Sequence, residues 1–213
     1  MSAASAGRLL CVPDNAERDG LASFVARVVR LDGSATVRLR VEAGRVVAWA
    51  TTPFGVLVTT DVAGELRPVE VTVSARELLT ALAVVRGPQV DPGSPAADRW
   101  STEPPPTTGW RAVAEVPTDE LAALAERAVA RADAHGIRPR ALPAEVLEET
   151  ALTLSADEAR LRVPLRCVLA LSGMGVLDRA EPVRVGVAGS WLRLATPLGA
   201  AVHRRFLLPL RGL

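Results

Sequence analysis

Arginine is the residue type in this sequence that is best suited to binding chemistry. The 213 residues hold 25 basic side chains against 24 acidic ones, and every basic one is arginine because the chain has no lysine. A guanidinium presents a planar fork of donors that matches carboxylate and phosphate groups. The net charge of only +1 removes the general attraction behind tight non-specific binding of nucleic acids, and leaves a local arginine patch open as a means of binding them.

Four arginines lie at helical spacing on two predicted helices. These candidates for phosphate contact are Arg27, Arg30, Arg127 and Arg131. Arginine side chains on helices can position a nucleic acid by contacting its backbone. The alternative is an ordinary solvated helix face, which Glu126 and Asp133 beside the second pair favour. The near-neutral net charge favours the same alternative.

Motifs for catalysis or cofactor binding are absent from the sequence. It contains no HExxH or CxxC pattern and no dinucleotide fingerprint, and the Gly-Met-Gly stretch 173–175 lacks the lysine and spacing of a phosphate loop. Two histidines and two cysteines are a poor set of metal ligands. The acidic run Glu145, Glu148 and Glu149 can hold a cation, but such a run is more often a solvated face. We therefore expect a non-enzymatic protein with no cofactor and no metal.

The remaining reactive side chains have structural interpretations. Cys167 stands among apolar neighbours and is expected to be a small core residue. His135 is expected to place a favourable charge at a helix C-terminus, and His203 to lie on the exposed side of a strand. No apolar run is long enough for a signal peptide or a membrane helix, and the two cysteines make no disulfide framework. These features predict a cytoplasmic protein without membrane contact.

A proline-rich segment divides the chain. Residues 87–109 hold six prolines among serine, threonine and aspartate. Proline lacks an amide donor and biases the preceding residue toward extended backbone. We predict a linker over 87–109 between domains at 1–86 and 110–213, with Trp100 and Trp110 pinning it to the surface.

Apolar periodicity predicts both helices and strands in each half. The first helix is expected to bury Leu21, Phe24, Val25 and Val28. Strands are predicted at 35–41, 45–51, 56–61, 69–73, 111–116, 151–155, 159–163, 183–187, 191–195 and 201–208. Further helices are predicted from a Ser74–Glu77 capping box to Gly87, over 118–135 with Thr118 as N-cap, and over 164–171. The fold class is therefore α+β, with antiparallel sheets, helices packed on one face and two similar halves.

The two halves also share a local pattern. Residues 37–55 contain a strand, an Ala-Gly turn, a second strand and a turn of the form Thr-Pro-x-Gly, and residues 183–199 repeat this order. Such an echo can indicate repeated structural units. The alternative is that two antiparallel meanders in a chain rich in valine, alanine and arginine look alike.

Four segments resemble parts of the bacterial DNA sliding clamp. The run 39–58 resembles the strand–turn–strand of a clamp domain, and 69–79 resembles its strand entering a helix. Residues 163–169 resemble a second helix entry, and 206–211 resemble the C-terminal strand and tail of the clamp. The resemblance implies a clamp-like α+β fold in both halves. A ring that encircles DNA is not implied, because clamps carry three such domains and this chain has room for fewer than two.

The resemblance also implies sites and partners. The tail can wall a groove for a partner peptide, and this groove would use Leu207, Leu208, Pro209, Leu210 and Arg211. The alternative is a last strand that packs into its own core. The expected interactions are with a partner protein or with DNA, and exposed strand edges can pair two copies into a homodimer. The other function class is a small-molecule-binding protein or an enzyme whose site forms only in three dimensions. A deep pocket with several converging arginines or carboxylates would favour this class.

Overall fold

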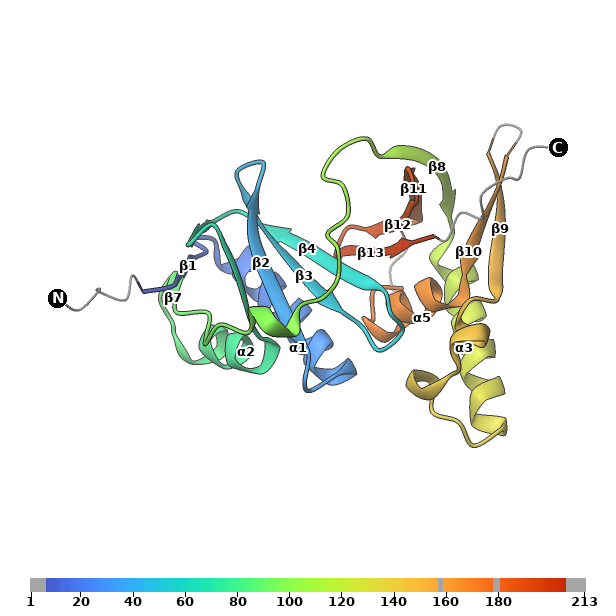
Figure 1. Ribbon diagram of the computed structural model, residues 1–213, viewed down its shortest axis with the longest axis horizontal. Coiled ribbons are helices and arrows are strands. Elements are labelled where there is room, and N and C mark those ends of the chain that lie inside the picture. The colour runs from blue at the N-terminus through green and yellow to red at the C-terminus, as the bar shows by residue number, and fades with distance from the viewer. Residues whose placement is uncertain (1–6, 157–158, 178–180, 206–213) are drawn as a thin grey trace. The chain divides into compact units, whose positions relative to one another are not determined.

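The computed structural model describes residues 7–156, 159–177 and 181–205, which group into two compact units (Figure 1). Unit 1 comprises residues 1–53 and 57–103, and unit 2 comprises residues 54–56 and 104–213. Each unit combines helices with antiparallel strands, which confirms the predicted α+β class.

Unit 1 carries a main antiparallel sheet and a small one. The main sheet has the order β6-β2-β3-β4, with β2 (Thr36–Glu42), β3 (Arg45–Thr51), β4 (Leu57–Val62) and β6 (Glu70–Ser74). The small sheet has the order β5-β1-β7, with β1 (Leu9–Cys11), β5 (Glu65–Arg67) and β7 (Gln89–Val90). The helical segments are α1 (Asn15–Leu31), α2 (Ala75–Val84) and the 3-10 turn η1 (Ala97–Arg99).

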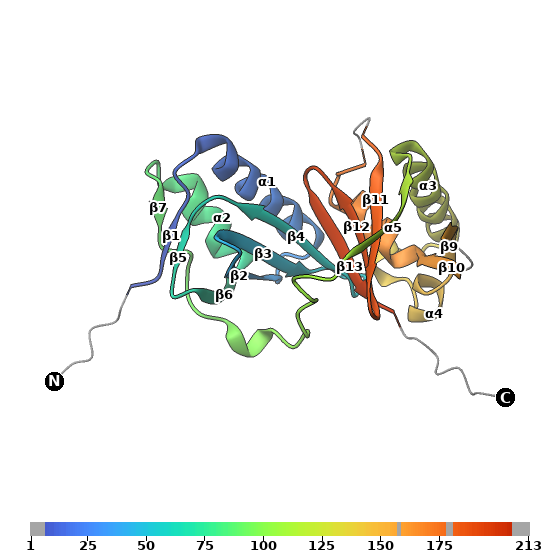
Figure 2. The same cartoon turned by 90° about the horizontal axis from the view of Figure 1, so that it is seen from above.

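The two α-helices of unit 1 lie side by side on one face of its main sheet (Figures 1 and 2). The apolar stripe predicted for α1 is buried, with none of its members more than 3% exposed: Leu21, Phe24, Val25 and Val28. Asp14 begins this helix, and its side chain accepts a hydrogen bond from the backbone N of Glu17 at 2.8 Å. That bond satisfies one of the amides that the first turn leaves without a helical partner.

Strand alternation in the main sheet follows the sequence pattern. Three residues of β3 are fully buried and their neighbours are half-buried: Val46, Ala48 and Ala50. Successive side chains of a strand point to opposite faces, so β2 can present arginine to solvent while it buries apolar residues. Arg38 and Arg40 both pair with Glu70 of the neighbouring β6, with N–O distances of 2.5 and 3.5 Å. These arginines belong to the solvent side of the sheet.

The capping box predicted at the start of α2 is wrong. Ser74 is the N-cap residue, but its side chain makes no capping hydrogen bond within the described chain. The Glu77 carboxylate accepts instead from the backbone N of Ser94 at 2.7 Å. The chain folds back beside α2 and supplies a donor that the local pattern cannot foresee. The helix also ends at Val84, before the predicted end at Gly87, and Val85 is 38% exposed.

Much of the proline-rich segment packs on unit 1. Gln89–Val90 pair with β1, and the backbone N of Ala96 donates to the carbonyl of Thr72 in β6 at 2.8 Å. The guanidinium of Arg38 lies over the ring of Trp100, 5.7 Å from its centroid. This contact is the surface anchor predicted for Trp100.

Unit 2 combines a second antiparallel sheet with a separate hairpin. The sheet has the order β13-β12-β11-β8, with β8 (Arg111–Val116), β11 (Val183–Ala188), β12 (Trp191–Thr196) and β13 (Gly199–Arg204). The hairpin consists of β9 (Thr150–Ala156) and β10 (Ala159–Pro164). The helical segments are α3 (Thr118–Ala134), η2 (Pro139–Ala141), α4 (Ala144–Leu147) and α5 (Leu165–Gly173). The helix α5 packs against α3, β13 and the hairpin (Figure 2).

The ends of α3 refine the sequence prediction. Pro117 is the N-cap residue, so Thr118 is the first helical residue rather than the cap predicted for it. The helix stops at Gly136, which has a φ of 67° and donates its backbone N–H to the carbonyl of Asp133 at 2.9 Å. Glycine adopts this left-handed conformation at little cost because it has no Cβ.

No helix in the described ranges is both long enough and apolar enough to cross a membrane.

The two meanders behind the sequence echo both form, but they occupy different places in their units. The strands β2 and β3 pair antiparallel, as do β11 and β12. In unit 1 the meander lies between α1 and α2, whereas in unit 2 it follows α5. The echo therefore matches parts that are not equivalent in chain order. The likeness of the two units lies instead in a shared order of strand, helix, strands, helix and strand.

Candidate functional site: an arginine pocket in unit 2

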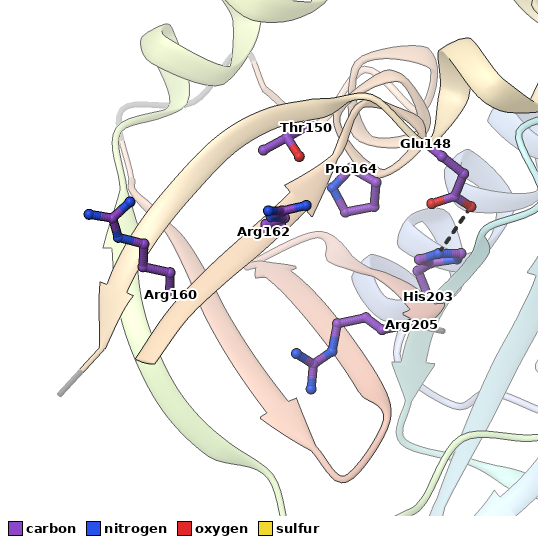
Figure 3. A pocket seen from close by; sticks show the side chains of 7 residues that line it. All are labelled: Glu148, Thr150, Arg160, Arg162, Pro164, His203 and Arg205. Atoms are coloured by element: carbon purple, nitrogen blue, oxygen red, sulfur yellow. Dashed lines mark ion pairs between the residues drawn. The ribbon is translucent and has the colours of Figure 1, made fainter. Parts of the chain in front are cut away.

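Unit 2 contains a cavity of about 320 Å³ whose walls are mainly charged (Figure 3). Its described lining residues, here called the arginine pocket, are Glu148, Thr150, Arg160, Arg162, Pro164, His203 and Arg205. They come from the β9–β10 hairpin, from the residue two positions before it and from the end of β13. The volume lies at the lower end of the range for small-ligand sites.

The β9–β10 hairpin places two of the arginines on one face. Leu161 and Val163 point the other way and are buried, at 6% and 0% exposure, because strand side chains alternate. Arg160 stands opposite Ser155 and Arg162 opposite Thr153. The polar face of the hairpin therefore joins arginines to hydroxyl residues.

Arg205 reaches the pocket from the residue after β13. Its Nη2 donates to the carbonyl of Gly189 at 2.8 Å. Its Nε is buried and has no hydrogen-bond partner among the described residues. Burial lowers the pKa of Arg205, because desolvation penalises the charged form. A buried donor without an acceptor carries a desolvation cost.

The one carboxylate among the lining residues is already engaged. Glu148 Oε1 lies 2.9 Å from Arg166 Nη2 and 3.8 Å from His203 Nε2. In contrast, the three arginines of the pocket form no ion pair with any carboxylate in the described ranges. Three guanidinium groups against one carboxylate leave the described lining with a net charge of +2 when His203 is neutral.

His203 is buried, which corrects the prediction that it lies on the exposed side of a strand. Only 7% of the residue is exposed, because both faces of β13 are covered at this point: Val202 beside it is 1% exposed. Burial is the main cause that lowers the pKa of His203 below its ordinary 6.5, and the charge of Arg166 acts in the same direction. Glu148 and a backbone hydrogen bond with Gly55 oppose that shift. His203 is therefore neutral at pH 7.

This buried histidine makes the stability of unit 2 depend on pH. In the unfolded chain His203 takes up a proton near pH 6.5, whereas in the folded chain it does so only at lower pH. The unfolded state thus binds more protons in that window, and the free energy of unfolding falls by up to about 1.4 kcal/mol per pH unit below 6.5. Well above pH 6.5 His203 is neutral in both the folded and the unfolded chain and contributes no pH dependence. Urea denaturation at pH 7.5 and 5.5, followed by hydrogen exchange of β12 and β13, measures this loss.

The matched variants are His203→Gln and His135→Gln. His135 is exposed and caps the C-terminus of α3, so its replacement is expected to leave the loss between pH 7.5 and 5.5 in place. His203→Gln is expected to reduce that loss. An unchanged loss in His203→Gln would show that other groups cause it.

The four arginines predicted on helix faces belong to different units. Arg27 and Arg30 lie on α1, half-buried and exposed respectively. Arg127 and Arg131 of α3 line a second cavity of about 310 Å³, and Arg131 Nη2 lies 2.8 Å from Glu149 Oε2. None of the four is among the described residues that line the arginine pocket.

The C-terminal tail, the acidic run and Cys167 are the remaining residues for which the sequence predicts a role. The residues predicted for a peptide groove lie outside the described residues: Leu207, Leu208, Pro209, Leu210 and Arg211. The acidic run does not converge on a cation, because Glu148 pairs with Arg166 and Glu149 with Arg131. No group of side chains suited to a metal ion occurs in the described ranges. Cys167 is the buried core residue predicted, and burial raises the pKa of its thiol.

Sequence reasoning missed the arginine pocket because its members are far apart in the chain. Alternation with Leu161 and Val163 marks Arg160 and Arg162 only as the solvent side of a strand, and both are exposed. Nothing in the local sequence ties them to Arg205. A usable signal is the face on which Thr153 and Ser155 join these arginines, because such a face has no apolar residue to bury.

Comparisons with known proteins bear on the fold. Residues 5–102 match a family model described as a domain of unknown function (DUF8010), and residues 105–207 match a second one (DUF8185). No curated protein matches the chain. Among solved structures, the beta sliding clamp of Caulobacter crescentus aligns at 13% identity with a TM-score of 0.56, over 93% of this chain and 65% of the clamp. The fold is sliding-clamp-like.

Other bacterial clamps give the same result. The DNA polymerase sliding clamp of Bacillus subtilis aligns at 11% identity and a TM-score of 0.56, over 93% of this chain and 64% of the clamp. The DNA polymerase III subunit beta of Pseudomonas aeruginosa aligns at 15% identity and a TM-score of 0.54, over 92% and 64%. The chain thus spans less than two thirds of the length of these clamps. The likeness confirms the resemblance predicted from the sequence, and at these identities it concerns the clamp-like fold alone.

Proposed function

We propose that this chain is a non-enzymatic interaction module with a clamp-like fold, and that the arginine pocket holds an anionic group of its partner. The observation that carries the proposal is the set of three arginines that line one cavity without a carboxylate partner in the described ranges. Guanidinium groups make strong, two-pronged hydrogen bonds to anions. Uncompensated positive charge in a cavity also raises the local concentration of anionic partners.

DNA association through the helix arginines is a second candidate. Its support is that Arg127 and Arg131 line one cavity on α3. The charge of this helix opposes it, because the exposed acidic residues of α3 outnumber its arginines: Asp119, Glu120, Glu126 and Asp133. Binding to the phosphate backbone draws its free energy from net positive charge. We therefore favour a partner protein over DNA.

A small anionic ligand is the alternative that the pocket itself supports. A cavity of about 320 Å³ is large enough for a compact molecule. In that case the chain would be a small-molecule-binding protein rather than an interaction module. The same three arginines would hold the ligand.

A homodimer, a peptide groove and a cytoplasmic location belong to the same proposal. The strand β8 is at the edge of the unit 2 sheet and pairs there with β11 alone among the described strands, so its other edge can pair with a second copy. The tail residues 207–211 are the proposed wall of a peptide groove. Both cysteines are free thiols, as in the cytoplasm, where we place the protein.

Titration with simple anions and with DNA tests the proposal. Sulfate and succinate are expected to bind in isothermal titration calorimetry, and the variant Arg160→Gln/Arg162→Gln to bind them at least about tenfold more weakly, because each lost charged hydrogen bond is worth about 1.5–3 kcal/mol. A labelled DNA duplex, followed by fluorescence anisotropy, is expected to bind weakly at physiological salt. The variant Arg27→Gln/Arg30→Gln/Arg127→Gln/Arg131→Gln is expected to leave anion binding unchanged.

Arg184→Gln is the matched control, because Arg184 is an exposed arginine of β11 that does not line the pocket. An equal loss of anion binding in this control would mean that the pocket is not the site. Tight duplex binding with a steep salt dependence, abolished by the helix variant, would favour the DNA candidate instead.

A further inference from the structure

We infer that the arginine pocket is a site for the terminal phosphate of a compact phosphate monoester; this inference rests on the anion binding proposed above. The first ground is charge. The described lining carries a net charge of +2 with His203 neutral. A phosphate monoester carries about −1.5 to −2 at pH 7, which matches that charge, whereas a single carboxylate neutralises half of it.

The second ground is the supply of donors. Arg160 and Arg162 each present a guanidinium fork without a carboxylate partner in the described chain, and Thr150 adds a hydroxyl. Arg205 lines the same cavity, where its Nη2 already donates to the carbonyl of Gly189 at 2.8 Å. A phosphate group offers three strong acceptor oxygens, so it can use several of these donors at once.

The third ground is that the acidic end of the pocket does not oppose the ligand. Glu148 and His203 lie together, whereas the guanidinium groups of Arg160 and Arg205 lie away from that pair (Figure 3). Glu148 Oε1 is held by Arg166 Nη2, 2.9 Å away, rather than by the arginines that line the pocket. The arginine end is therefore free to attract an anion.

The size of the cavity favours a compact ligand over a polymer. At about 320 Å³ it can enclose a phosphate with a small organic remainder. A nucleic-acid backbone instead offers singly charged diesters, each of which neutralises only half of the net charge of the described lining.

The test compares phosphoserine, inorganic phosphate, sulfate and succinate by calorimetry at constant ionic strength. Phosphoserine is expected to bind at least about tenfold more tightly than succinate, because its phosphate carries about two charges and three acceptor oxygens on one group, whereas the two charges of succinate lie on separate carboxylates. Arg160→Gln/Arg162→Gln is expected to weaken phosphoserine at least about tenfold, by loss of two charged donors. Arg184→Gln is expected to bind phosphoserine within about twofold of the wild-type affinity, as for a surface change away from the site.

A pH comparison separates a monoester from other anions. The second pKa of a phosphate monoester is about 6, so a shift from pH 7.5 to 5.5 removes most of its second charge. Sulfate keeps both charges over this range and reports any change in the pocket itself, including protonation of His203. The affinity ratio of phosphoserine to sulfate is therefore expected to fall several-fold.

Three results would overturn the inference in distinguishable ways. Equal binding of succinate and phosphoserine, with the loss still specific to the pocket variant, would leave anion binding standing and remove the phosphate assignment. Binding of a DNA oligomer that grows with length and ignores its 5′-phosphate would assign the pocket to phosphodiesters. No binding of any anion would remove both the inference and the proposed function.

Discussion

Replacing Arg18 with methionine will lower the free energy of unfolding of unit 1 by about 3 kcal/mol. Arg18 lies on α1, is only 7% exposed and donates to the carbonyls of Leu82, Val85 and Gly87, at 3.0 Å in the case of Leu82. These carbonyls lie at the C-terminal end of α2, where the helix leaves acceptors unpaired and its dipole favours a cation. Methionine keeps most of the volume and removes every donor.

The effect belongs to unit 1 and is measured there. Hydrogen exchange of peptides from α1 and α2 is expected to accelerate, while peptides from α5 and β12 keep their rates. The matched control is Arg27→Met on the same helix, expected to change the free energy of unfolding by less than about 0.5 kcal/mol, as for a side chain outside such a network. Equal effects at positions 18 and 27 would show that helix propensity, not the three carbonyls, is responsible.

Replacing Gly64 with alanine will destabilise unit 1 by about 1–3 kcal/mol, the usual cost of forcing an atom into occupied space. Gly64 lies between β4 and β5, where the chain passes close to β1. A Cβ at this position would clash with the carbonyl oxygen of Cys11 and lie 3.4 Å from its carbonyl carbon. Both atoms belong to the backbone, so relief requires β1 to move from β5, with which it pairs.

Replacing Gly20 with alanine is expected to stabilise unit 1 instead. Gly20 lies inside α1, and a Cβ there would meet nothing within 4 Å. Alanine is expected to stabilise the helix by about 0.5–1 kcal/mol, because glycine loses more backbone freedom on folding. Thermal denaturation of the two variants should therefore shift in opposite directions. A Gly64→Ala transition at the wild-type temperature would show that the backbone there yields without cost.

The elements that apolar periodicity defines could be predicted from the sequence. The α1 stripe and the strand at 45–51 follow from apolar residues, because each element buries one face against a core and burial imposes the period. Contacts that return from distant parts of the chain could not be predicted. The sequence places Glu77 in a capping box, but its carboxylate accepts a hydrogen bond from the backbone N of Ser94. His203 was assigned to an exposed face, but both faces of β13 are covered.

The candidate site was even less accessible to sequence reasoning. Arg160 and Arg162 come from β10 and Arg205 from the residue after β13, and α5, β11 and β12 separate them in the chain. Each arginine alone looks like a solvent-side residue. The sequence does contain a signal for the buried Arg18 contact in unit 1. Arg18 continues the spacing of Leu21, Val25 and Val28, so a charge lies within an apolar stripe. A charge in such a place must find partners, and Arg18 does so in α2.

The proline-rich segment has a consequence for how unit 1 avoids self-association. The outer strand β6 would present unpaired backbone groups, but Pro95 bridges Val73 and Ala96 bonds to Thr72 along that edge. Across the small sheet, β7 covers β1 in the same way. Proline cannot donate a hydrogen bond, so a covering chain that contains it does not extend the sheet further. The proline-rich segment, which composition marks as a spacer, thus protects unit 1 from edge-to-edge aggregation. A truncation before Gln89 would expose the edges of β6 and β1 to other chains.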